Sequence, residues 1–94
     1  MFIATCVLKI DLPAVFSLKE KRRIVKSILT RVRREFNLAV AEVDHHDVWG
    51  TAVLALVTVG TDKGHLHGRL EKAITWIQQQ RPDLPLDDYY IEFR

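Results

Sequence analysis

Two adjacent histidines, His45 and His46, lie between Asp44 and Asp47, and imidazole and carboxylate groups are common metal ligands. If this stretch continues a β-strand, successive side chains point to opposite faces, so only Asp44 and His46 share a side. Two ligands are fewer than the three or four that a bound zinc ion needs. We therefore expect the polar tip of a hairpin here and no metal site.

The remaining candidates for catalysis do not form a recognisable set. His65 and His67 are two residues apart in a helical pattern, so they point away from each other. Cys6 is the only cysteine and lies in an apolar run, which favours a packed, reduced thiol. We expect no catalytic residues and no cofactor. An enzyme stays a third hypothesis, which would need a pocket uniting His46 with Asp44 and another ligand.

Positive charge is concentrated in one part of the chain. Residues 17–36 carry a charge of +6, which leaves −4 for the remainder of a chain whose total is +2. Glu20 and Glu35 are the only acids in this segment. Its basic residues are Lys19, Lys21, Arg22, Arg23, Lys26, Arg31, Arg33 and Arg34.

Four of these eight cations fall on one flank of the predicted helix. Successive residues of an α-helix are about 100° apart around its axis, and this spacing aligns some of the basic residues in a ridge. Both acids of the segment lie off this ridge. The ridge consists of Lys19, Arg23, Lys26, Thr30 and Arg33 or Arg34. Cations at each helical turn can meet successive phosphates of a nucleic acid without reading its sequence. We predict a non-catalytic RNA-binding protein, with ribosomal RNA as the favoured partner and a binding surface of Lys19, Lys21, Arg22, Arg23, Lys26, Arg33 and Arg34. Arg31 lies off the ridge, where Glu35 one turn on would moderate its charge.

Hydrophobic periodicity predicts six elements along the chain. Alternation at every second residue indicates strands, and recurrence at three or four residues indicates helices. The predicted order is a strand at 2–12, a helix at 17–37, strands at 38–46 and 48–60, a helix at 61–81 and a strand at 86–94. This β-α-β-β-α-β order is typical of an α+β, ferredoxin-like fold with a four-stranded antiparallel sheet. We expect one domain over residues 1–94, with the first and third strands in the centre and both helices on one face.

Local signals support the helix boundaries. Ser17 and Glu20 have the spacing of a capping box, and Asn37 can close the far end of the first helix. Thr61 or Asp62 can cap the second helix.

The sheet face away from the helices predicts a second surface. If Leu54 and Leu56 face the helices, Val53, Ala55 and Val57 face outward. This face lacks the paired aromatic residues with which an RNA recognition motif stacks bases, so burial against protein is favoured. We expect self-association, as a homodimer, through these three residues.

The alternative function is a self-associating or protein-binding module. In that hypothesis the basic ridge docks on an acidic surface of another chain, such as Glu42, Asp44 and Asp47. Salt-dependent oligomerisation would distinguish it from RNA binding.

The sequence gives no sign of a membrane partner. No apolar stretch approaches the ~20 residues of a spanning helix. The first ten residues, MFIATCVLKI, lack a basic leader and a cleavage site. We expect a cytoplasmic location.

Three stretches of the chain resemble the YlxP-like family of small bacterial proteins. They are SLKEKR at residues 17–22, AEV at 41–43, and the D-x-W pattern of Asp47 and Trp49. The resemblance implies a ferredoxin-like fold, a cytoplasmic bacterial setting and a link to RNA binding or ribosome assembly without an established reaction. It also assigns Lys19, Lys21 and Arg22 to the family's basic helix start. Gly50 departs from the pattern, in which a larger polar residue is expected after the tryptophan.

Overall fold

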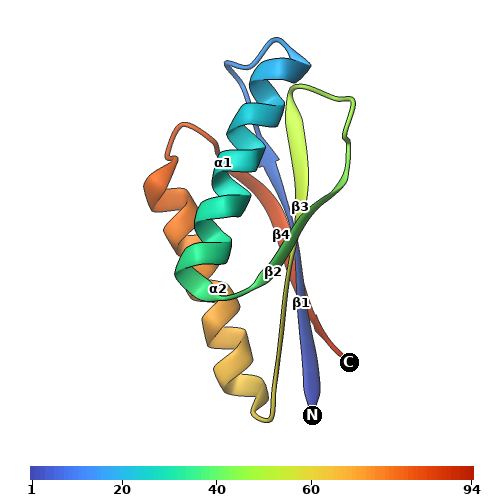
Figure 1. Ribbon diagram of the computed structural model, residues 1–94, viewed down its shortest axis with the longest axis vertical. Coiled ribbons are helices and arrows are strands. Elements are labelled where there is room, and N and C mark those ends of the chain that lie inside the picture. The colour runs from blue at the N-terminus through green and yellow to red at the C-terminus, as the bar shows by residue number, and fades with distance from the viewer.

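The computed structural model describes all residues from 1 to 94. The elements are β1 (Phe2–Asp11), α1 (Leu18–Phe36), β2 (Ala39–Asp44), β3 (Thr51–Gly60), α2 (Lys63–Gln80) and β4 (Leu86–Phe93). Figure 1 shows the two helices on one face of the sheet, with both chain termini at the same end of the molecule. This arrangement confirms the predicted α+β, ferredoxin-like fold.

The four strands form one antiparallel sheet in the order β2-β3-β1-β4. The two most apolar strands, β1 and β3, occupy its centre and pair in register along their whole length, from Phe2 with Gly60 to Asp11 with Thr51. β2 and β4 are the edges, as expected from right-handed crossovers. The edge of β2 lies below α1, which decides the geometry of the basic surface described below.

Strand alternation places one hydrophobic core between the sheet and the helices. Leu54 and Leu56 are fully buried on the helix side, which confirms their predicted orientation. Val53, Ala55 and Val57 alternate with them and are only partly covered, on the open side of the sheet. Buried residues of α1 include Ile24, Val25, Ile28 and Val32, and those of α2 include Leu66, Leu70, Ala73, Ile74 and Ile77.

The helix caps follow the sequence signals. Ser17 Oγ accepts a hydrogen bond from the backbone N–H of Glu20 at 3.2 Å. Asn37 ends α1 with a left-handed φ of 50°, and its N–H bonds to the Arg33 carbonyl. Asp62, rather than Thr61, caps α2 by accepting from His65 N–H. These bonds satisfy backbone groups that a helix terminus leaves without partners.

The link between β2 and β3 is longer than the sequence predicts. β2 ends at Asp44 and β3 begins at Thr51, so residues 45–50 form a turn instead of continuing two strands. The pairing of β2 with β3 shifts between Glu42 and Asp44, and His45 has a φ of 56°. Asp44 stabilises this bend by accepting the His45 N–H at 2.8 Å. Strict strand alternation therefore does not extend through the two histidines.

Neither helix is long and apolar enough to cross a membrane.

Candidate nucleic-acid interface

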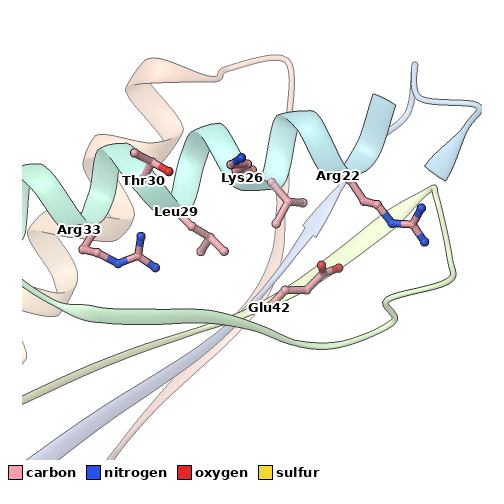
Figure 2. A pocket seen from close by; sticks show the side chains of 7 residues that line it. Arg22, Lys26, Leu29, Thr30, Arg33 and Glu42 are labelled. Atoms are coloured by element: carbon pink, nitrogen blue, oxygen red, sulfur yellow. The ribbon is translucent and has the colours of Figure 1, made fainter. Parts of the chain in front are cut away.

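A groove lies between α1 and the edge strand β2, and cations line it from one end to the other. Its volume is about 290 Å³. Arg22, Lys26, Thr30 and Arg33 come from successive turns of α1, while Val25 and Leu29 supply the apolar part and Glu42 comes from β2. Figure 2 shows Leu29 and Arg33 projecting toward β2 and Glu42 rising toward α1, with Arg22 at the opposite end from Arg33. This set is named the α1–β2 groove below.

The cations of the groove are exposed and largely without acidic partners. Lys26 and Arg33 form no ion pair, and Arg33 donates only to the Val40 carbonyl at 3.4 Å. Arg22 lies 4.0 Å from Asp47, at the limit of an ion pair, and both side chains are exposed to solvent. An exposed pair of this kind contributes little and can exchange for a phosphate. Spaced over eleven residues, these cations span about 16 Å of helix.

A second, smaller basic hollow lies at the start of α1. It has a volume of about 240 Å³ and is lined by Ser17, Lys19, Glu20 and Arg23. The N-terminal end of a helix carries partial positive charge, so cations there are unfavourable for the helix alone and add to its attraction for anions. The structure thus divides the predicted ridge: Lys19 and Arg23 belong to this hollow, while Lys26, Thr30 and Arg33 belong to the groove together with Arg22.

Lys21 is not available to a partner, and its assignment to the binding surface is wrong. The residue is completely buried. Its ammonium group lies 3.1 Å from Glu42 Oε2 and donates to the carbonyls of Val48, at 2.6 Å, and His45. A lysine on a basic helix looks like its neighbours in sequence, but this one faces the sheet, where the acid and carbonyls replace its hydration.

The pairing of Lys21 removes Glu42 from the acidic surface on which, in the alternative hypothesis, the basic ridge would dock. Of the three acids proposed for that surface, Glu42 is engaged within its own chain, and Asp47 lies near Arg22 of the same chain. Asp44 accepts the neighbouring backbone N–H.

The two remaining arginines of α1 differ in their surroundings. Arg34 is exposed and makes no ion pair. Arg31 bonds to Gln80 of α2, and its guanidinium lies 5.3 Å from the centre of the Trp76 ring. Arg31 is therefore held by α2 and forms no ion pair with Glu35. Trp76 in turn packs edge to face against Phe36.

Two exposed aromatic side chains, in the loops before α1 and after β2, were not among the predicted binding residues. Trp49, in the turn after β2, is 51% exposed, and Phe16, just before the α1 cap, is 72% exposed. Figure 1 shows their two loops at the same end of the molecule. The available signal was the position of both aromatics in polar or proline-bounded connections, where core packing is unusual.

The histidines of this turn do not converge. His46 Nε2 contacts the Glu42 carbonyl at 3.1 Å, while His45 Nδ1 is buried without a hydrogen-bond partner. His65 lies near Arg69, and His67 lies 3.7 Å from Glu71, so the second pair has separate partners as well. No three His, Cys, Asp or Glu side chains gather in positions that could share a metal ion.

Cys6 is buried on the helix side of β1. Burial, together with the negative charge of Glu71, raises the pKa of the thiol to about 11. A thiol with such a pKa is almost entirely protonated near neutral pH and is a poor nucleophile. Glu71 also accepts hydrogen bonds from the Tyr89 hydroxyl at 3.1 Å, and this bond raises the pKa of Tyr89.

Fold and surface together define a small ferredoxin-like α+β protein with a cationic helix beside a free sheet edge. Residues 3–89 match the family described as "Protein of unknown function (DUF503)", so the chain belongs to that family. It is 33% identical over 61 residues to "Uncharacterized protein YlxP" of Bacillus subtilis (strain 168). That alignment covers 65% of this chain and 66%, just under two thirds, of the relative. The predicted YlxP-like membership is confirmed.

Two solved structures share the fold at low sequence identity. A putative antibiotic biosynthesis monooxygenase from Deinococcus radiodurans has a TM-score of 0.57 at 17% identity, covering 100% of this chain and 90% of the other. The de novo designed protein Foldit4 has a TM-score of 0.54 at 16% identity, covering 98% and 96%. At these identities the likeness concerns the fold alone, which supports many unrelated functions.

Proposed function

We propose that this protein binds the phosphate backbone of RNA along α1 and acts without catalysing a reaction. The observation that carries the proposal is the α1–β2 groove, in which Arg22, Lys26 and Arg33 face one channel. Its only acid, Glu42, is already neutralised by Lys21. The groove therefore presents a nearly uncompensated positive field, which favours a polyanion over a neutral ligand.

We further propose that the bound RNA is ribosomal, that the protein is cytoplasmic, and that it has a role in ribosome assembly. Resemblance to the YlxP-like proteins supports it, and the charge distribution agrees because phosphate contacts position a protein on structured RNA without reading bases. The binding surface is Lys19, Arg22, Arg23, Lys26, Arg33 and Arg34, without Lys21.

A non-catalytic role is supported by the state of the reactive groups. The thiol of Cys6 is buried and protonated, and Glu71 has only Tyr89 and His67 as polar partners. None of these groups lines the basic groove.

Charge reversal of the groove tests the proposal. Replacing Arg22, Lys26 and Arg33 by Glu should abolish binding of a labelled structured RNA at low salt, while the circular dichroism spectrum stays native because all three side chains are exposed. Lys26→Glu alone should weaken binding more than Lys72→Glu, its matched control on the exposed face of α2. The proposal fails if wild-type protein does not bind RNA at low salt, or if the two lysine variants bind alike.

A second function, self-association, is favoured by the open sheet face. Val53, Ala55 and Val57 of β3 lie beside Val59, which is 56% exposed, and no element covers them. A twofold interface pairs a surface with itself, so an uncharged aliphatic strip is self-complementary, whereas a strip of like charges would repel. We propose a homodimer formed through this face, which leaves α1 free on the opposite side of each copy.

A further inference from the structure

The end of the α1–β2 groove nearest the β2–β3 turn combines phosphate-binding charge with an exposed aromatic side chain. Arg22 is the last cation of the groove at this end and lies 4.0 Å from Asp47. Trp49 follows two residues later in the same turn and is 51% exposed. A chain whose phosphates follow α1 from Arg33 to Arg22 therefore arrives at the turn that carries Trp49.

The backbone on both sides of Trp49 is anchored. The Val48 carbonyl accepts a hydrogen bond from buried Lys21 at 2.6 Å, and the Gly50 carbonyl accepts one from Leu12 N–H at 2.9 Å. Trp49 is thus presented by an anchored turn, so the backbone of the turn loses little further freedom when a ligand packs on the ring.

The exposure of Trp49 contrasts with that of the second tryptophan. Trp76 packs against Phe36 and under Arg31. Trp49 has no aromatic or cationic partner within the chain. Val48, which precedes it, is also exposed, and so is Phe16 in the loop before α1. Leaving a large apolar ring in water forgoes stabilisation of about 25 cal/mol for each Å² that could be buried. A ligand that covers the ring recovers that energy.

We propose that the nucleic acid bound by this protein is single-stranded, with phosphates along the α1–β2 groove and a base stacked on Trp49. The inference rests on the proposed function and names its substrate class. Stacking needs an unpaired base with a free π-face, which a duplex does not offer along its length.

Tryptophan fluorescence of the full chain provides the test. In a Trp76→Phe background, Trp49 is the only tryptophan, so its emission reports on the turn alone. A short oligouridylate should quench this emission, and anisotropy of the labelled oligomer should show tighter binding than a duplex RNA of equal length. Trp49→Ala, in the wild-type Trp76 chain, should weaken single-strand binding roughly tenfold or more, as for one lost stacking contact. It should leave duplex binding unchanged, and Trp49→Phe should retain most of the affinity.

The outcomes separate this inference from RNA binding itself. Equal affinity for single strand and duplex, with Trp49 emission unchanged, would overturn the single-strand assignment while the groove remains an RNA site. If neither RNA binds at low salt, the proposed function fails together with it. If Trp49→Ala abolishes dimer formation and leaves RNA affinity intact, the aromatic end belongs to a protein contact instead. Should Trp76→Phe fail to fold, the anisotropy comparison of wild type with Trp49→Ala decides alone.

Discussion

The ammonium group of Lys21 lies 3.1 Å from the carboxylate of Glu42, inside the contact between α1 and β2. The lysine side chain is 1% exposed and that of Glu42 is 16% exposed. The contact is an ion pair without ideal hydrogen-bond alignment, since Glu42 Oε2 has no donor in good geometry. The other bonds of Lys21 go to the His45 and Val48 carbonyls, so one buried cation connects the helix, the edge strand and the turn.

Removing the Lys21 charge should strongly destabilise the fold. Lys21→Met leaves Glu42 uncompensated and deprives two carbonyls of a donor, and such a loss costs about 3–5 kcal/mol. The double variant Lys21→Met/Glu42→Leu should recover part of this, because the buried charge is gone but the carbonyls still lack a donor. Urea unfolding measures the free energy of unfolding of both variants. A Lys21→Met midpoint equal to that of Lys72→Met would show that the pair is not structural.

The dependence of RNA affinity on salt concentration should report the number of phosphate contacts. Each phosphate contact contributes a little less than one to the slope of log affinity against log salt. Lys26→Ala should therefore lower that slope by about one and weaken binding to different RNA sequences almost equally. Trp49→Ala should weaken single-strand binding without changing the slope. Fluorescence anisotropy at several salt concentrations measures both, and an unchanged slope for Lys26→Ala would remove Lys26 from the interface.

Cys6 should be unreactive in the folded protein. Because burial raises its pKa to about 11, a thiol reagent should modify it only as fast as the chain opens, and rapidly in urea. The folded state holds this proton more tightly than the unfolded state, whose pKa is near 9.0, so the associated stability is present below pH 9 and is lost as pH rises toward 11. The stability difference between wild type and Cys6→Ala should shrink over that range. Rapid native-state modification would contradict the burial.

An acidic side chain on the open sheet face should make the proposed homodimer dissociate into monomers. Val57→Asp places a charge among Val53, Ala55 and Val59, where a covering copy would have to desolvate it. Sizing with light scattering should find a wild-type dimer and a Val57→Asp monomer of native helical content. Thr61→Asp, outside the sheet, is the control. A wild-type monomer at high concentration would end the self-association proposal.

The sequence by itself determined the order, faces and caps of the elements. Strand alternation assigned Leu54 inward and Val53 outward because successive residues of a strand must point to opposite faces. Ser17 and Asn37 marked the ends of α1 because helix termini need partners for specific backbone groups. The sheet order followed from the handedness of crossovers. All of these are local or topological rules.

Only the tertiary structure decided which cations face solvent. Lys21 and Arg22 are neighbours in a basic string, yet one is buried against Glu42 and the other lines the groove. That difference depends on β2 packing beside α1, a contact between residues 21 positions apart. The placement of the turn that carries Trp49 likewise depends on hydrogen bonds from Lys21 and Leu12, both distant in sequence. Helical periodicity describes the directions of side chains around one axis, but burial depends on which other element approaches that axis.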